Sequence, residues 1–308
     1  MTYPFIKSTL KGNLPSEDEV LEIYGKIMVN AFFIVNNAIE HIGYGLYLGA
    51  SILDHSCAPN AHWHFRGKEV IIRTTEYVSD FSDLRISYLK NLTETTQQRQ
   101  EKLLQNYHFL CDCSTCKDEI KDQTKSSLLC PNCKLGCVPL VIGKCMDCNF
   151  SIDSSMTEKY EEIQNQLRKV EEEYSFEEMF HQAVALLHPY DNSYMEFLNL
   201  YSAKDEEYQT KNLSNCLEIS KIKLRHLYRH LPAFEMHIGK EEIQAAKFCC
   251  LLDFLDEAEK HINKARNIFE ANFGEDHPIL YEGLKPIYLL IDERRQKEQL
   301  LNLTYPRS

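Results

Sequence analysis

The spacing of apolar residues divides the chain into a mixed amino-terminal part and a helical carboxyl-terminal part. Apolar residues recur at helical intervals over 17–35, and short runs of alternating polarity follow. Residues 61–65 and 70–73 flank a turn at Gly67, which predicts a β-hairpin. Residues 84–89 predict one more strand. We therefore expect a β-rich, glycine-punctuated first part.

From about Met156 onward the apolar spacing is helical throughout. Leu255 is expected to open a helix that reaches Phe273. Gly274 follows as its stop signal, and Pro278 suits the first turn of the next helix. The sequence thus predicts an all-helical second part.

A weak internal repeat of 41 residues relates two of these helices. The corresponding positions are Leu224, Leu227 and Tyr228 with Ala265, Ile268 and Phe269. Paired helical repeats bury one stripe and offer a concave face, commonly to a peptide. A plain helical bundle without any ligand fits the spacing equally well.

Length and charge narrow the class of protein. A chain of 308 residues allows two or three structural units. The net charge of −12 argues against direct nucleic-acid binding, which relies on Lys and Arg at phosphates. An acidic surface suits lysine-rich partners or serves solubility alone. No apolar run reaches the roughly 18–20 residues of a membrane span, so no membrane association is expected.

Cysteines carry the strongest chemical signal. Twelve are present, and nine of them fall within 57–148. No apolar leader follows Met1, so we expect metal ligands rather than disulfides. A C-x-C-x-x-C motif within 111–116, joined by one distant cysteine, predicts a closed four-thiolate zinc site. Its ligands would be Cys57, Cys111, Cys113 and Cys116.

A second cysteine group follows a charged linker. Its two C-x-x-C motifs are Cys130 with Cys133 and Cys145 with Cys148. Motifs of this kind, eleven residues apart across a short β-hairpin, predict a zinc ribbon and therefore a second zinc ion. A polar helix is expected to lead into the C-x-C-x-x-C motif, and Thr93 or Thr95 is expected to cap it.

Other candidate groups are interpreted more simply. His62 and His64 share one face of a predicted strand, and no further ligand type is near, so we expect surface or rim histidines. The pair Cys249 and Cys250 lies in an apolar helix and is expected to pack in the core. Cys137 lies between the ribbon motifs and is assigned no role.

Three motifs resemble the SET-and-MYND family of protein lysine methyltransferases. They are SILDHSCAPN at 51–60, ISYL at 86–89 and YHFLCDCSTC at 107–116. The resemblance covers roughly residues 20–118 and extends more weakly through the helical tail, where GEDHP occupies 274–278. It implies a transferase that uses S-adenosylmethionine and acts on histone or other protein lysines, in the nucleus and cytoplasm.

The resemblance also implies roles for individual residues. Tyr88 and Tyr107 match the aromatic pair around the lysine channel, and the four cysteines at 57 and 111–116 match the post-SET zinc ligands. Residues that match the cofactor wall are Asn30, Ser51, Leu53, Asp54, His55 and Phe109. Asp54 stands where the family usually has asparagine. A carboxylate there donates no hydrogen bond to the cofactor when ionised.

The resemblance implies an α+β chain with four parts and an incomplete amino-terminal side. We expect the second half of a SET domain at 1–93, a post-SET segment at 94–118, a ribbon-like hairpin at 119–152 and a TPR-like helical domain at 153–308. No glycine-rich cofactor loop precedes residue 30 and no MYND cysteines occur. Two functions therefore stay open: a lysine methyltransferase, or a non-catalytic, zinc-stabilised scaffold with a peptide partner on its helical face.

Overall fold

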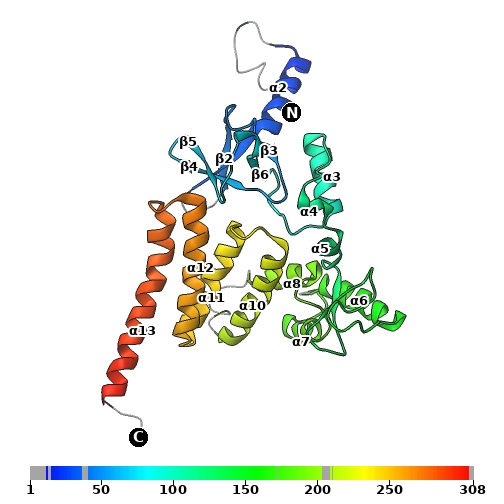
Figure 1. Cartoon of the computed structure of the whole chain (residues 1–308), viewed down its shortest axis with the longest axis vertical. Coiled ribbons are helices and arrows are strands. Elements are labelled where there is room, and N and C mark those ends of the chain that lie inside the picture. Colours follow the sequence, from blue (N-terminus) through cyan, green and yellow to red (C-terminus); the bar gives the residue numbers. More distant parts are fainter. Residues whose placement is uncertain are drawn as a thin grey trace.

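The computed structural model of the chain describes most of the sequence. Described are residues 12, 15–36, 41–170, 172–202, 209 and 211–304, with the side chains of 298–304 excepted. The protein is a mixed α+β chain in which helices predominate, and the strands of the described residues pair into four two-stranded sheets. Figure 1 shows the strands β1–β6 gathered beside α2, with the long helices α10–α13 on another side of them.

The first described elements are a helix and a hairpin. Helix α2 spans Glu17–Asn30 and begins with a capping box at Ser16. Strands β1 (Ala31–Val35) and β2 (His41–Leu46) then pair antiparallel. The helix expected over 17–35 is thus too long by five residues. Two phenylalanines and two β-branched residues follow Ala31, and such residues favour an extended chain over a helix.

The next strands bring together two of the three motifs that resemble the SET-and-MYND family. Strand β3 (Asp54–His55) pairs in parallel with β6 (Arg85–Ile86), so only two residues of the strand expected at 84–89 form. The hairpin of β4 (Ala61–Arg66) and β5 (Glu69–Thr74) is confirmed, with Gly67 in the left-handed region. The pairing of β3 with β6 places the SILDHSCAPN motif directly beside the ISYL motif.

The middle of the chain holds both cysteine groups. Helix α3 (Thr96–Tyr107) is capped by Thr95 through a capping box with Gln98, which confirms one of the two expected caps. The short helices α4 (Ser114–Lys117) and α5 (Glu119–Gln123) follow. The antiparallel strands β7 (Ser127–Leu129) and β8 (Cys137–Pro139) then form the expected hairpin of the ribbon.

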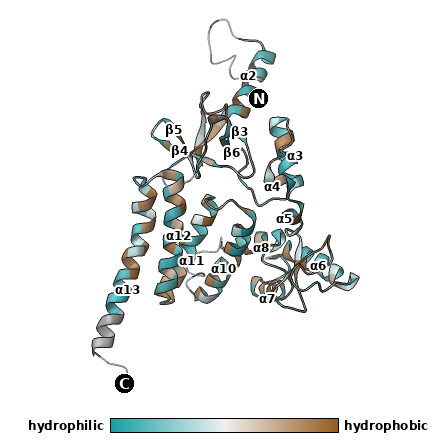
Figure 2. Ribbon diagram, viewed as in Figure 1, coloured by the Kyte–Doolittle hydropathy of each residue, from teal (hydrophilic) through white to brown (hydrophobic). Residues whose placement is uncertain are grey.

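The remainder is helical, as predicted. Its elements are α6 (Ser154–Leu167), α7 (Phe176–Leu186), α8 (Asn192–Ser202), α10 (Leu213–His230), α11 (Met236–Leu251), α12 (Leu255–Phe273), the π-helix η2 (Ile279–Leu284) and α13 (Lys285–Thr304). Helix α12 has the bounds that the sequence predicts, and Gly274 at its end has φ of +85°. Figure 2 shows hydrophobic and hydrophilic residues alternating along these helices, as expected where one face is buried.

The core of the long helices continues into the first cysteine cluster. Cys57, Cys111 and Leu103 belong to the same buried cluster as the facing residues of α10–α13. Tyr88 and Tyr107 pack against this cluster. Helix α2, in contrast, has no buried residue, so its apolar stripe contributes nothing to the core. The long helices therefore pack against both the cysteine cluster and the two tyrosines.

Candidate active site and metal centres

Four sulfur atoms meet where the upstream loop reaches the C-x-C-x-x-C turn. The sulfur atoms of Cys57, Cys111, Cys113 and Cys116 all lie within 4.8 Å of one another. The Sγ atom of Cys57 lies 4.0 Å from that of Cys111 and 3.6 Å from that of Cys116. Zn–S bonds of about 2.3 Å in a tetrahedron separate the sulfurs by about 3.8 Å. The cluster thus has the donor set and the size of a structural zinc site.

Two side chains contact this cluster from outside, and one of them, Arg99, was not predicted from the sequence. The fully buried Arg99 of α3 donates from Nε to the Cys57 sulfur at 3.2 Å and from Nη2 to the Cys116 sulfur at 3.5 Å. Its positive charge would offset part of the negative charge that four thiolates give to a bound zinc ion. The buried His55 lies on the other side, with Nε2 3.3 Å from the Cys57 sulfur. Outer-sphere partners of this kind orient ligands.

His55 also joins the cluster to the aromatic residues. The backbone N–H of Tyr88 donates to His55 Nδ1 at 3.0 Å. Because Nδ1 accepts that bond, the ring proton is on Nε2 and points to the Cys57 sulfur. His55 is therefore a direct bridge between the sulfur of Cys57 and the backbone of Tyr88. The resemblance assigns it to the cofactor wall, and the structure adds this link.

The second cysteine group also forms a compact cluster. The sulfur atoms of Cys130, Cys133, Cys145 and Cys148 lie within 4.8 Å of one another. Two of the pairs lie at 3.6 Å and 3.8 Å. The Asn132 side chain donates to the Cys148 sulfur and holds the pKa of that thiol at about 6, which favours the thiolate that a metal needs. All twelve cysteines are free of disulfides, and Cys137 stays outside both clusters.

The two tyrosines of the candidate catalytic pair are neighbours. The rings of Tyr88 and Tyr107 lie 4.8 Å apart between centroids, and Phe109 meets Tyr88 edge to face at 6.3 Å. The Tyr88 hydroxyl donates to the carbonyl oxygen of Leu53 at 2.5 Å. Burial, followed by the nearby Asp54 carboxylate, raises the pKa of Tyr88, and burial raises that of Tyr107. Both phenols are therefore neutral hydrogen-bonding groups near pH 7.

A small cavity lies against this pair. Its wall includes Asn30, Ser51, Leu53, Tyr88 and Tyr107, which come from α2, the loop before β3, the residues after β6 and the end of α3. Its volume is about 40 Å³. Enclosed ligand pockets usually reach roughly 300–1,000 Å³. The described residues thus provide a wall for a ligand and do not enclose one.

Three residues expected on the cofactor wall, Asp54, His55 and Phe109, lie outside this cavity. Asp54 is largely exposed and forms an ion pair with Arg85 at 4.0 Å across the β3–β6 pair. Phe109 packs its ring beside His55, with centroids 6.0 Å apart. Asp54 and Phe109 nevertheless lie near Tyr88. Phe109 contacts the Tyr88 ring, and Asp54 pairs with Arg85, which shortly precedes Tyr88 in the chain.

A larger cavity adjoins the small one. Its volume is about 270 Å³, and it shares Phe33, Trp63 and Ser87 with the small cavity. Helix α11 and the residue before it close the far wall with Glu235 and His237. The two cavities therefore share part of one wall, and the helical tail lines only the larger one.

Of the two histidines of β4, one lies where the sequence predicts and the other does not. His62 lines the 270 Å³ cavity at the rim, as expected. His64 is buried, with its ring 5.5 Å from Phe273 and 5.7 Å from His277, so the surface reading is wrong for this residue. The pattern within the strand carried no information about α12, which covers that face from more than 200 residues away.

Comparisons with known proteins identify relatives of this chain. No family model matches the chain. Histone-lysine N-methyltransferase SMYD3 of Mus musculus is 35% identical over 109 residues, which are 35% of this chain and 25% of that protein. N-lysine methyltransferase SMYD2 of Homo sapiens is 20% identical over 268 residues, or 87% of this chain and 60% of that protein. SMYD2 of Gallus gallus is also 20% identical, over 89% of this chain.

The relatives named here are lysine methyltransferases. By this likeness the chain belongs to the SET-and-MYND family, the group of SMYD2 and SMYD3. It spans about 60% of the length of human SMYD2 and 25% of mouse SMYD3. Within the described residues, none of the helices combines the length and apolar character that crossing a bilayer requires.

Proposed function

We propose that this chain carries the lysine-binding and post-SET side of an S-adenosylmethionine-dependent protein lysine methyltransferase. One observation carries the proposal. The facing rings of Tyr88 and Tyr107 are tied through His55 to a cluster of four cysteines, beside a cavity lined by Asn30 and Ser51. Motifs far apart in the sequence thus meet at one place.

The proposed organisation follows the parts seen along the chain. Residues up to 93 supply the SET portion, and 94–118 supply the post-SET zinc segment. Residues 119–152 form the zinc ribbon and 153–308 the TPR-like helices. Support comes from the separate hydrophobic clusters of the first strands and of the helical tail. We further propose that each four-cysteine cluster holds one zinc ion.

The chemistry requires alignment more than acid or base groups. S-adenosylmethionine supplies an electrophilic methyl group on a positively charged sulfur. The neutral lysine nitrogen forms the new N–C bond as the C–S bond breaks; the sulfur keeps the electron pair, and the methylated amine releases a proton to solvent. The protein must hold the amine on the line of approach and in its uncharged form.

Tyr88 and Tyr107 would perform both tasks. Their rings limit the path of a lysine side chain to one direction, which reduces the entropy lost at reaction. The apolar surroundings that raise the pKa of both phenols also disfavour an ammonium group, and so lower the pKa of a bound lysine. Asn30 and Ser51, with polar side chains at the small cavity, would bind the cofactor.

The 270 Å³ cavity is the proposed approach for the protein substrate. It shares Trp63 and Phe33 with the small cavity, so a lysine side chain that enters there would approach the tyrosines past these two rings. The buried Glu235 and the exposed Lys240 on its far wall give it groups of both signs. Histone or other lysine-bearing tails are the proposed partners.

Ligand binding and methyl transfer test the proposal together. Isothermal titration with S-adenosylhomocysteine should show binding at millimolar ligand or below, and Asn30→Ala should weaken it. Tyr107→Ala should abolish methylation of a histone mixture. Tyr77→Ala is the matched control, since that tyrosine is 91% exposed and lines neither cavity. Absence of S-adenosylhomocysteine binding at millimolar concentration would end the proposal for this chain.

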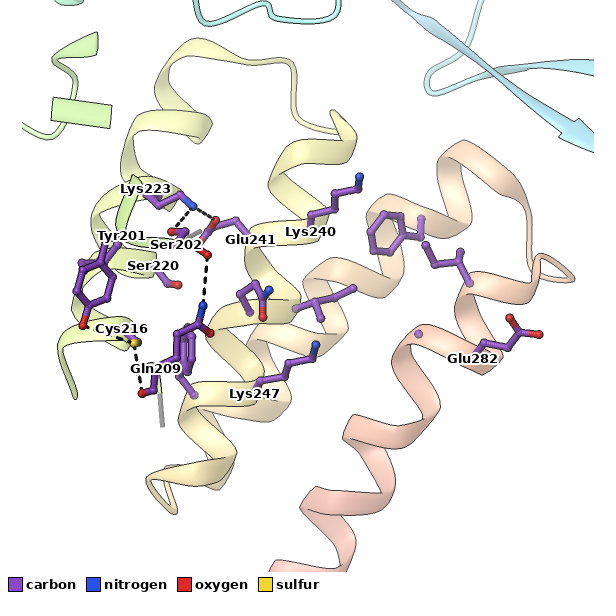
Figure 3. A pocket seen from close by; sticks show the side chains of 17 residues that line it. Tyr201, Ser202, Gln209, Cys216, Ser220, Lys223, Lys240, Glu241, Lys247 and Glu282 are labelled. Atoms are coloured by element: carbon purple, nitrogen blue, oxygen red, sulfur yellow. Dashed lines mark hydrogen bonds and ion pairs between the residues drawn. The ribbon is translucent and has the colours of Figure 1, made fainter. Parts of the chain in front are cut away.

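A non-catalytic scaffold is the second candidate, and a different observation favours it. A cavity of about 520 Å³ lies among α8, α10, α11 and η2, while the one at the tyrosines is far smaller. Figure 3 shows Lys223, Glu241 and Lys247 around it. An extended peptide with both charges would fit such a wall. Methylation of any lysine substrate by the purified chain would refute the scaffold as the sole function.

A further inference from the structure

A third group of metal-binding side chains lies at the turn between α11 and α12. Cys249 comes from the last turn of α11, and Glu257 and His261 come from the first two turns of α12. One donor atom from each of the three lies within 4.8 Å of the others. Glu257 and His261 are four residues apart and so share one face of their helix. Three different ligand types therefore converge from two helices.

A buried carboxylate orients the histidine of this group. Glu242 lies two turns before Cys249 on the same helix and is fully buried. Its Oε2 atom lies 2.5 Å from Nδ1 of His261, and its Oε1 accepts a hydrogen bond from the Tyr228 hydroxyl at 2.5 Å. A histidine that donates Nδ1–H to a carboxylate keeps Nε2 as a lone-pair donor. Metal-binding histidines are commonly held in this way.

We propose that Cys249, Glu257 and His261 bind a third divalent ion of the zinc class. Thiolate, imidazole and carboxylate together suit zinc among the common divalent ions, and three protein ligands leave a fourth position for water. The site would fasten the α11–α12 turn to α10, because Glu242 also bonds Tyr228. It is separate from both four-cysteine clusters and does not depend on methyl transfer.

A lysine already pairs with one of the three proposed ligands. Lys221 of α10 lies 2.9 Å from Glu257 Oε2, and both side chains are about half exposed, at 42% and 50%. The ammonium group balances the carboxylate when no ion is present, and it can turn out to solvent when an ion binds. Removing it should therefore strengthen metal binding by about two- to fivefold, the effect of one exposed ion pair.

The test is a metal titration of the purified full chain after its tightly held zinc has been counted. Co²⁺ should bind with one further equivalent and give the absorption of a cobalt–thiolate bond. Cys249→Ser should lose this equivalent and the absorption, and Glu257→Gln should weaken binding at least tenfold. Cys250→Ser is the matched control, because Cys250 is equally buried, adjacent and outside the cluster. Lys221→Met should bind more tightly than the wild type.

Three results would overturn the proposal. The first is a wild-type chain that binds no cobalt beyond exchange into the two cysteine clusters. The second is equal binding by the wild type and Glu257→Gln. The glutamate substitution matters here because Glu257 is half exposed, so its loss leaves the fold intact even where Cys249→Ser destabilises the helices. The third is a wild-type-like charge-transfer band in Cys249→Ser, which would exclude Cys249 as the thiolate ligand.

Discussion

Replacing Arg99 with methionine should loosen the first zinc site without removing a ligand. Arg99 is fully buried and donates to two of the four sulfur atoms, at 3.2 Å and 3.5 Å. Hydrogen bonds to charged groups contribute about 1.5–3 kcal/mol each. Its other bonds reach the Glu94 carbonyl oxygen and the Thr96 hydroxyl, and these support the start of α3 whether or not zinc is bound.

The substitution should lower two quantities, the stability of the chain and its affinity for zinc. We expect the free energy of unfolding of the zinc-loaded chain to fall by about 3–5 kcal/mol, as for other broken buried charge interactions. Zinc affinity should fall by about 10–100-fold, which is typical of an outer-sphere partner. The fall in zinc affinity is smaller because the lost bonds to Glu94 and Thr96 weaken the zinc-free chain as well.

A competition assay measures the second quantity directly. Zinc release to a chelator of known affinity is followed for the wild type, Arg99→Met and Lys102→Met. Lys102 lies on the same helix and is half exposed, so its substitution removes the same charge without touching sulfur. The ribbon cluster in the same molecule should release zinc equally in all three. A folded Arg99→Met chain whose zinc affinity stays within threefold of the wild type would refute the reasoning.

Three further results are expected. Tyr88→Phe should lower stability by about 1 kcal/mol, because its hydroxyl donates to the Leu53 carbonyl; a thermal melt measures this, and an unchanged melting temperature would argue against the bond. Burial lowers the pKa of His188 and of His226 from 6.5 to about 4, so as pH falls below 6.5 the unfolded chain binds protons that the folded chain excludes. Urea unfolding should therefore show a loss of about 2 kcal/mol per histidine at pH 5, and His226→Gln should reduce the drop; a pH-independent midpoint would contradict this. Chelation should expose residues 57–148 to hydrogen exchange well before the helical tail, and uniform exposure would contradict the coupling of zinc to this region.

Sequence was most informative where chemistry depends on spacing. The C-x-C-x-x-C motif at 111–116 and the two C-x-x-C motifs predicted two cysteine clusters, and the structure contains both. Helix α12 was predicted to the residue, because Gly274 ends a strongly periodic segment. The end of α2 was missed, since apolar residues continue at a helical interval into β1 and only their β preference marks the change.

Contacts between distant segments could not be predicted in this way. Arg99 looks like an ordinary polar helix residue, and only the fold places it against the Cys57 sulfur, 42 residues away. The burial of His64 depends on α12, which reaches it from the far end of the chain. Cys249 looked like a core residue until the turn of α11 and α12 placed Glu257 and His261 beside it.

Zinc K-edge X-ray absorption tests most directly whether Cys57 joins the three downstream cysteines around one ion. The Cys249→Ser chain is the material of choice, because it retains only the two four-cysteine clusters. Two zinc ions per chain, each with four sulfur neighbours at about 2.3 Å, are expected. In Cys57→Ser, the average should fall below four sulfurs or one zinc should be lost. Four sulfurs on both ions in Cys57→Ser, or disulfides in place of zinc, would contradict the account.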